Sequence, residues 1–85
     1  MAVSSNKDIS VKKYTLPQIT FTFSGSFKSV GSVPSNILPR AVGVYISYLG
    51  DNTGPVSLCL GNDAVYALGT NGTTMTRLEA TVVYI

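Results

Sequence analysis

Histidine is absent from this 85-residue chain, and cysteine occurs once, as Cys59. Without histidine, neither a Ser-His-Asp nor a Cys-His arrangement can form, and no imidazole can act as a general base near neutral pH. The usual nitrogen and sulfur ligands of zinc are lacking for the same reason. The glycines match no phosphate-binding loop, which argues against a nucleotide cofactor. We therefore expect a protein that is not an enzyme, with no catalytic residues, no metal and no cofactor.

Charged residues are scarce as well, at 12% of the chain, against about 25% in an ordinary soluble domain. A surface with few ions suits broad contacts between protein chains, because little charge must be stripped of water. The alternative is a β-domain that uses serine and threonine simply to keep its exposed strand faces polar. The charges are also unevenly placed, since residues 1–40 hold five cations and one carboxylate, and residues 41–85 hold one cation and three carboxylates. Such a dipole favours oriented contacts between copies.

Long apolar runs are missing too. Residues 1–10 lack the apolar core of a secretory signal, and the longest apolar neighbourhood is residues 41–49. A membrane-spanning helix needs roughly 20 apolar residues. We expect a chain that is made in the cytoplasm without a signal peptide and does not insert into a membrane.

The small size of the chain indicates that its own core leaves a thin margin of stability. Small domains usually gain further stability from disulfides, metals or oligomerisation, and a single cysteine cannot form an internal disulfide. Oligomerisation is the least obstructed route. We expect a homo-oligomer, with a trimer as the first guess.

What the chain does contain is an alternation of apolar and polar side chains, the period of a half-buried β-strand. The alternation predicts a short strand over residues 9–14 and clearer strands over 19–24, 41–49, 56–60, 64–68 and 75–85. No long stretch has a helical period. We therefore predict an all-β fold, a small antiparallel β-sandwich or barrel of about six strands. Residues 1–8 are expected to form a loose polar arm, and residues 9–85 a single β-domain.

Turn-forming residues separate the predicted strands. Residues 30–40 contain Gly31, Pro34 and Pro39 and are typical of a surface loop. The pair Asn71-Gly72 predicts a type I′ hairpin between the last two strands, because both residues of that turn need positive φ.

The alternation also assigns side chains to faces. In residues 41–49, one face is expected to hold Val42, Val44, Ile46 and Tyr48, and Tyr45 lies on the other. Cys59 falls opposite the apolar face of its strand, where we interpret it as a small, half-buried filler. The last strand is apolar to its end and needs cover, either from its own sheet or from a neighbouring copy.

The sparse charge, the polar arm and the apolar final strand are together similar in kind to small β-domains that build symmetric assemblies, including phage capsid decorations and fibre tips. The resemblance is one of composition. It implies a structural subunit that self-assembles, docks on a larger protein assembly or a cell surface, and is incorporated into a virus particle. The residues expected at such contacts are Lys12, Lys13, Tyr14, Asn36, Arg40, Tyr45, Asp51, Asn52, Asn62, Asp63, Val83 and Ile85.

A lectin-like module is the alternative. Four tyrosines, accompanied by asparagine and aspartate in turns, are the residue types of a shallow sugar site: Tyr45, Tyr48, Tyr66 and Tyr84. Tyrosine is equally common in sheets, so this signal has little specificity. A surface glycan would then be the partner.

A β-barrel that binds single-stranded nucleic acid is a further alternative, because basic and aromatic residues occur together at Lys12, Lys13, Tyr14, Phe21, Phe23 and Lys28. However, the phenylalanines alternate with threonine as core residues do. So few cations also give weak binding at physiological salt, and we do not expect a nucleic-acid partner.

Oxygen ligands for calcium are available in two turns, from Asp51 and Asn52 and from Asn62 and Asp63. They would form a site if the two turns converged. The competing interpretation, which we prefer, is that these side chains bond to nearby backbone amides in the turns themselves.

Overall fold

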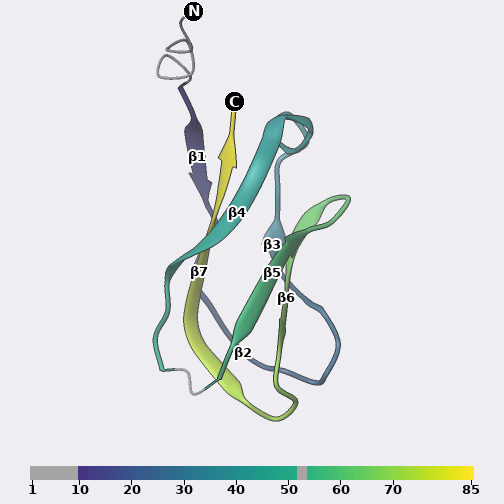
Figure 1. The fold of residues 1–85 in the computed structure, drawn as a ribbon, viewed down its shortest axis with the longest axis vertical. Helices are drawn as coiled ribbons and strands as arrows, with labels where there is room; N and C mark the ends of the chain where they lie inside the picture. The colour runs from purple at the N-terminus through teal and green to yellow at the C-terminus, as the bar shows by residue number, and fades with distance from the viewer. Residues whose placement is uncertain (1–9, 52–53) are drawn as a thin grey trace, which may run out of the picture.

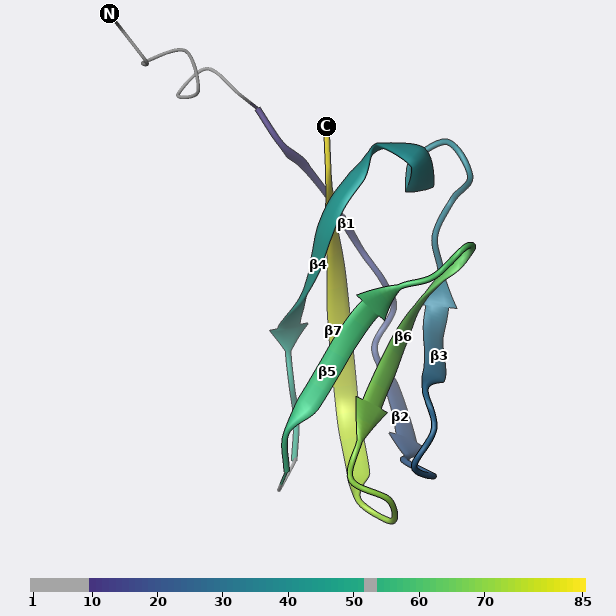
Figure 2. The same ribbon diagram turned by 45° about the vertical axis from the view of Figure 1, so that its right-hand side comes forward.

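The computed structural model describes residues 10–51 and 54–85, which form two antiparallel sheets stacked as a sandwich (Figures 1 and 2). The strands are β1 (Lys12–Thr15), β2 (Ile19–Thr22), β3 (Lys28–Ser32), β4 (Ala41–Tyr48), β5 (Val56–Leu60), β6 (Ala64–Gly69) and β7 (Thr74–Tyr84). The prediction of an all-β, antiparallel fold is confirmed. The described residues form seven strands instead of six, and the two sheets do not close into a barrel.

The predicted arm, residues 1–8, and the candidate residue Asn52 lie outside the described residues. Within the described residues the helical structure is one 3₁₀ turn, η2 (Leu38–Arg40), and no helix there is long and apolar enough to cross a membrane.

The first sheet is built around β7, the last strand of the chain. β1 and β4 pair with the same residues of β7, 81–84, from opposite edges, and β2 follows β1 along its edge. Between β1 and β2 the pairing continues, because the Leu16 N–H donates to the Ala80 carbonyl at 2.8 Å. Pro17 follows and has no N–H to give, which interrupts the ladder there. The apolar last strand therefore receives its cover from its own sheet.

The second sheet has the order β3-β6-β5. β3 occupies part of the segment that was predicted as a surface loop, so that prediction is wrong for residues 30–32. Val30 is buried and belongs to the core, but Gly31 and the flanking serines hide the alternation, and a bulge between Ser29 and Gly31 shifts its register. The rest of the segment is a loop that still contributes Val33 and Ile37 to the core.

The turn at Asn71-Gly72 is not a hairpin. It carries the chain from β6 in the second sheet to β7 in the first, and the two strands do not pair. Gly72 has φ +89° whereas Asn71 has no positive φ, so the turn is not type I′ either. Its backbone instead bonds to Phe23, whose carbonyl accepts from the Gly72 N–H at 2.8 Å and whose N–H donates to Thr73 at 2.9 Å.

The core lies between β6 and β7. Its most deeply buried side chains are Phe23, Val65, Met75, Leu78 and Val82. Phe21 and Phe23 meet edge to face, with ring centroids 4.9 Å apart, so the apolar face predicted for residues 19–24 is confirmed.

We predict that Gly69→Ala destabilises the fold by about 1–3 kcal/mol, because an added methyl group would overpack the core. A Cβ at this position would stand 2.5 Å from the Phe23 ring, which is itself 1% exposed. Denaturant unfolding measures the change. Gly43→Ala is the matched control in a strand of the other sheet, since no atom lies within 4 Å of its Cβ. Equal stability of the two variants would contradict the prediction.

Candidate functional site

The residues singled out in the sequence do not form one cluster. Several of them meet at the end of the first sheet where β7 finishes. The Arg40 guanidinium lies over the Tyr84 ring, with its Cζ 5.1 Å from the ring centroid, and its Nε donates to the Asn36 carbonyl at 3.3 Å. The Ile85 N–H donates to the Arg40 carbonyl at 3.1 Å, and Lys12 pairs with Tyr84 across the sheet. This end is basic and has an exposed apolar tip at Ile85.

The other residues predicted on β1 and β7 have a different setting. Lys13 is exposed and pairs with Val83, whereas Tyr14 is half-buried against the core. Val83 also pairs with Gly43 on its other side. It therefore sits in the centre of the sheet and offers no free strand edge to a neighbouring copy.

The two turns that could supply calcium ligands do not converge. Asp51 precedes β5 and bonds to β7, where its N–H donates to Thr76 Oγ1 at 2.7 Å. Asn62 and Asp63 follow β5 and connect it to β6, so a whole strand separates the two groups. Asp63 instead accepts a hydrogen bond from the Tyr66 hydroxyl at 3.3 Å. The arrangement does not support a shared cation site, and the interpretation that these side chains bond to turn amides stays a prediction.

The aromatic half of the nucleic-acid interpretation is buried. Phe21 and Phe23 are 9% and 1% exposed, so their faces are not available to stack on bases. Lys28 covers part of this region, with its Nζ 5.8 Å from the centroid of the Phe21 ring.

The tyrosines of the lectin interpretation are separated by the fold. Tyr66 belongs to β6 in the second sheet, and Tyr84 is half-buried beneath Arg40. Tyr45 and Tyr48 remain, and both are exposed on β4, at 41% and 42%.

A bulge in β4 places these two tyrosines on one face. Ile46 pairs with Ala80 and Tyr48 with Glu79, so Ser47 is an extra residue between them. An extra residue shifts the alternation by one, which turns Tyr48 to the face that Tyr45 occupies. The prediction that Tyr48 shares a face with Val44 and Ile46 is therefore wrong. A second bulge, at Val42, leaves that side chain 61% exposed, unlike the half-buried Val44 and Ile46 with which it was predicted to share a face.

A hydrogen-bonded network crosses the same outer face of the first sheet. The Thr15 and Thr81 hydroxyls lie 2.9 Å apart, and the Thr81 hydroxyl donates to Ser47 Oγ at 2.7 Å. The Ser47 hydroxyl lies 3.0 Å from Glu79 Oε1, and Gln18 donates to Glu79 Oε2 at 3.4 Å. The network joins β1, β7 and β4, so the bulge at Ser47 is held in place from β7.

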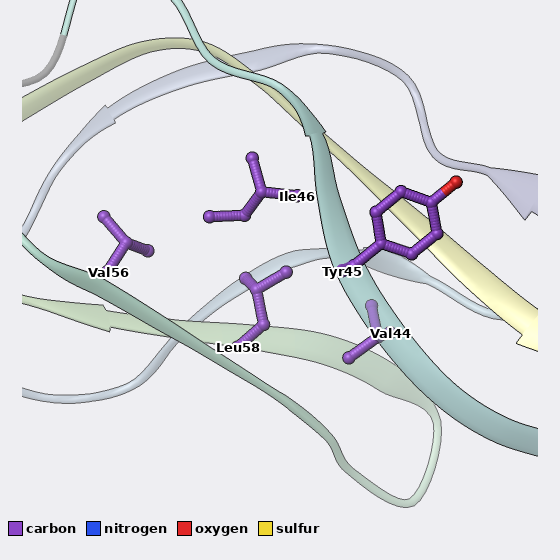
Figure 3. Close-up of a pocket in the computed structure, with 5 residues that line it drawn as sticks. All are labelled: Val44, Tyr45, Ile46, Val56 and Leu58. Atoms are coloured by element: carbon purple, nitrogen blue, oxygen red, sulfur yellow. The ribbon is translucent and has the colours of Figure 1, made fainter.

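The side of the sandwich bounded by β4 and β5 is open. Each of these strands pairs with one neighbour and leaves its other edge free of sheet partners among the described strands. Between them lies a hollow of about 240 Å³, lined by Val44, Tyr45, Ile46, Val56 and Leu58. Figure 3 shows the aliphatic side chains gathered between the two strands, with the Tyr45 ring turned to the other side of β4. We call this region, the two strand edges and the hollow, the open side.

The strands of the open side contain no charged residue. β4 reads AVGVYISY and β5 reads VSLCL. The strands on the opposite side of the sandwich (Figure 2) carry Lys12, Lys13 and Lys28, and Pro17 lies between the first two of them, β1 and β2. Lysine and proline on an edge strand discourage pairing with another chain. The side of the sandwich opposite the open side therefore has residues that discourage strand pairing, whereas β4 and β5 lack them.

Cys59 lies on β5 and its side chain is exposed. The interpretation as a half-buried filler is wrong, because β5 is an edge strand whose outer face is not covered by other described residues.

Comparisons of the chain with family models, with curated proteins and with solved structures found no match.

Sequence reasoning missed the hollow and the grouping around Ser47. Val44, Ile46, Val56 and Leu58 have the alternation of ordinary core residues, and nothing local shows that the two sheets separate here. The absence of charged residues from two successive strands, β4 and β5, is visible in the sequence and could have indicated this region. Bulges depend on pairing between distant strands, so Ser47 carried no comparable signal.

We predict that Asp63→Asn lowers the pKa of Tyr66. In the wild type the pKa of Tyr66 is raised above its ordinary value of 10.0, chiefly by repulsion between the Asp63 carboxylate and the phenolate, then by burial and by the hydrogen bond. The folded state therefore retains this proton longer than the unfolded state, and the resulting stability is present below about pH 10 and lost above it as the phenol ionises. In the variant less stability is lost over this range.

Ultraviolet absorbance titration of phenolate formation provides the measurement, with Tyr66→Phe to assign the signal. Asp51→Asn removes a carboxylate at the other end of β5 and serves as the control, with an unchanged titration. A Tyr66 titration that does not move in Asp63→Asn would contradict the assignment of the shift to this pair.

Proposed function

We propose that this protein is a non-catalytic structural subunit that self-associates through its open side. The observation that carries the proposal is the pair of uncharged edge strands, β4 and β5, on either side of an apolar hollow. Docking of the resulting assembly on a larger protein assembly or a cell surface stays a prediction from the sequence.

The open side offers two sources of binding free energy. Val44, Ile46, Val56 and Leu58 are half-buried, and covering them would remove further apolar surface from water, at about 25 cal/mol per Å². The edges of β4 and β5 also present backbone groups that a further strand can pair with.

β5 is the more regular of the two edges. Its five residues pair with β6 without a register shift, whereas β4 contains two bulges. Bulges twist an edge and weaken it as a template for pairing. β5 is therefore the edge on which we expect a strand of another copy to align.

The properties of the chain favour a second copy of itself as the partner that binds the open side. A thin core without an internal disulfide favours stabilisation by association, and a contact between copies requires no partner of different chemistry. An antiparallel β5–β5 contact has twofold symmetry and yields a dimer. The trimer expected from the sequence requires the β5 edge of one copy to meet the β4 edge of the next. The native mass distinguishes these two arrangements, and both use the open side.

We predict that Ser57→Lys weakens self-association by about tenfold or more, because a symmetric edge contact places like charges close together. Ser57 is exposed on β5 and pairs with Leu68 of β6. Ser29→Lys is the matched control, since Ser29 is exposed on β3 and pairs with Tyr66 of the same central strand. Sedimentation velocity over a micromolar concentration series gives the association constants.

Two results would overturn the proposal. A wild-type chain that remains a monomer throughout the series shows that the open side does not bring copies together. Equal weakening by Ser57→Lys and Ser29→Lys shows that association does not use this side. Unfolding curves of both variants establish that any loss of mass does not come from a loss of fold.

A further inference from the structure

Tyr45 and Tyr48 form an exposed aromatic pair on the outer face of the first sheet, on the far side of β4 from the apolar hollow. They pair with Thr81 and Glu79, which are two residues apart on β7. At a rise of about 3.4 Å per residue, their attachment points are about 7 Å apart along the strand. Both rings are about two-fifths exposed, at 41% and 42%. We call Tyr45, Ser47, Tyr48, Arg77 and Glu79 the tyrosine face.

Polar groups stand directly beside the two rings. Glu79 is the central one, with its two carboxylate oxygens bonded to Ser47 and to Gln18 at 3.0 and 3.4 Å. An ionised carboxylate has about four acceptor sites. Glu79 therefore keeps the capacity to accept hydrogen bonds from the hydroxyl groups of a ligand, and Gln18 adds an amide that can donate or accept.

Arg77 lies over one face of the Tyr48 ring. Its Cζ lies 5.6 Å from the centroid of that ring, within the range of a cation–π contact. Arg77 has φ +52°, and it is the one residue other than glycine with positive φ in the part of the chain that the structure describes. A left-handed conformation is unfavourable for such a residue, and such strain is concentrated at functional sites.

The left-handed residue Arg77 lies in a β-bulge of β7. Leu78 pairs with Ile19 and Met75 with Phe21, so β7 has one more residue than β2 in this interval. The extra residue keeps Leu78 and Met75 both in the core while Arg77 is exposed. The two bulges, at Ser47 and at Arg77, therefore converge on Tyr48 from neighbouring strands and fix its surroundings.

We propose that the tyrosine face binds a neutral oligosaccharide. A sugar ring presents electropositive C–H groups on one side, which suit the electron-rich face of an aromatic ring, and it presents hydroxyls at its rim, which suit Glu79 and Gln18. The nearby charges are balanced, because Arg77 and Glu79 have opposite signs. A neutral ligand fits this balance better than an anionic one. Because Glu79 and Ser47 are already hydrogen-bonded and Tyr48 is already held by Arg77, these side chains lose little conformational freedom when a ligand binds, which favours affinity.

The proposal is separated from self-association through Tyr48, because Tyr45 also lines the hollow of the open side whereas Tyr48 does not. A glycan array with neutral, carboxylated and sulfated oligosaccharides, read at low and at high salt, identifies the ligand class. Calorimetric titration with the strongest neutral oligosaccharide then gives the affinity per chain. We expect binding to neutral oligosaccharides that is insensitive to salt, because stacking and neutral hydrogen bonds are not screened.

Single substitutions test the geometry. Tyr48→Ala and Tyr45→Ala are each expected to weaken binding by about tenfold, which corresponds to about 1.4 kcal/mol, and Tyr48→Phe to retain most of it. Phe27→Ala is the matched control, because Phe27 is 52% exposed outside this face; its affinity should equal that of the wild type. Ser57→Lys is expected to keep the affinity per chain, which separates this site from the open side. Melting curves confirm that the variants are folded.

Four results would overturn the proposal. Absence of binding to every neutral oligosaccharide removes the site. Binding restricted to anionic glycans and lost at high salt shows attraction by charge instead of stacking. Equal effects of Phe27→Ala and Tyr48→Ala show that the tyrosine face is not where the sugar lies. Association between copies that is lost in Tyr48→Ala but kept in Ser57→Lys assigns this face to a protein contact.

Discussion

The pairing of β7 on both of its edges is the interaction on which the rest of this structure depends. Residues near the start of the chain, in β1 and β2, pair along one edge, and β4 pairs along the other. The apolar last strand becomes the centre of its sheet, and its inward side chains pack against β6. This arrangement determines which edges remain free. It leaves the lysine-bearing strands on one side of the sandwich and the uncharged strands β4 and β5 on the other.

Much of the strand content could be predicted from local alternation. β5 was predicted with its observed bounds, and β7 with bounds that differ by one residue at each end. Local patterns failed where distant pairing decides the outcome. Asn71-Gly72 specifies a reversal of the chain but not the sheet that receives the next strand. Tyr48 was assigned to the wrong face because one extra residue, Ser47, exists only relative to the opposite residues of β7.

The candidate site was less accessible to sequence reasoning than the fold. Residue types indicated tyrosines and small polar side chains, and the fold then separated Tyr66 and Tyr84 from the other two. What brings Tyr45 and Tyr48 together is a bulge, and what surrounds Tyr48 is a second bulge at Arg77. Each bulge lets its strand keep apolar residues on the inner face while it changes which side chains lie on the outer face. A strict alternation could not satisfy both requirements in β4.

β4 connects the two proposed activities physically. Val44 and Ile46 line the hollow from its inner face, and Tyr45 and Tyr48 project from its outer face. Association through the open side would therefore present one tyrosine face per copy in a fixed arrangement. A shallow site on a flat sheet encloses little of its ligand and gives weak affinity in a single copy. Several such sites on one assembly act together, because binding at the first raises the effective concentration of ligand at the others. Self-association would thus compensate for the openness of the sugar site, without a deeper cleft than a domain of this size can form.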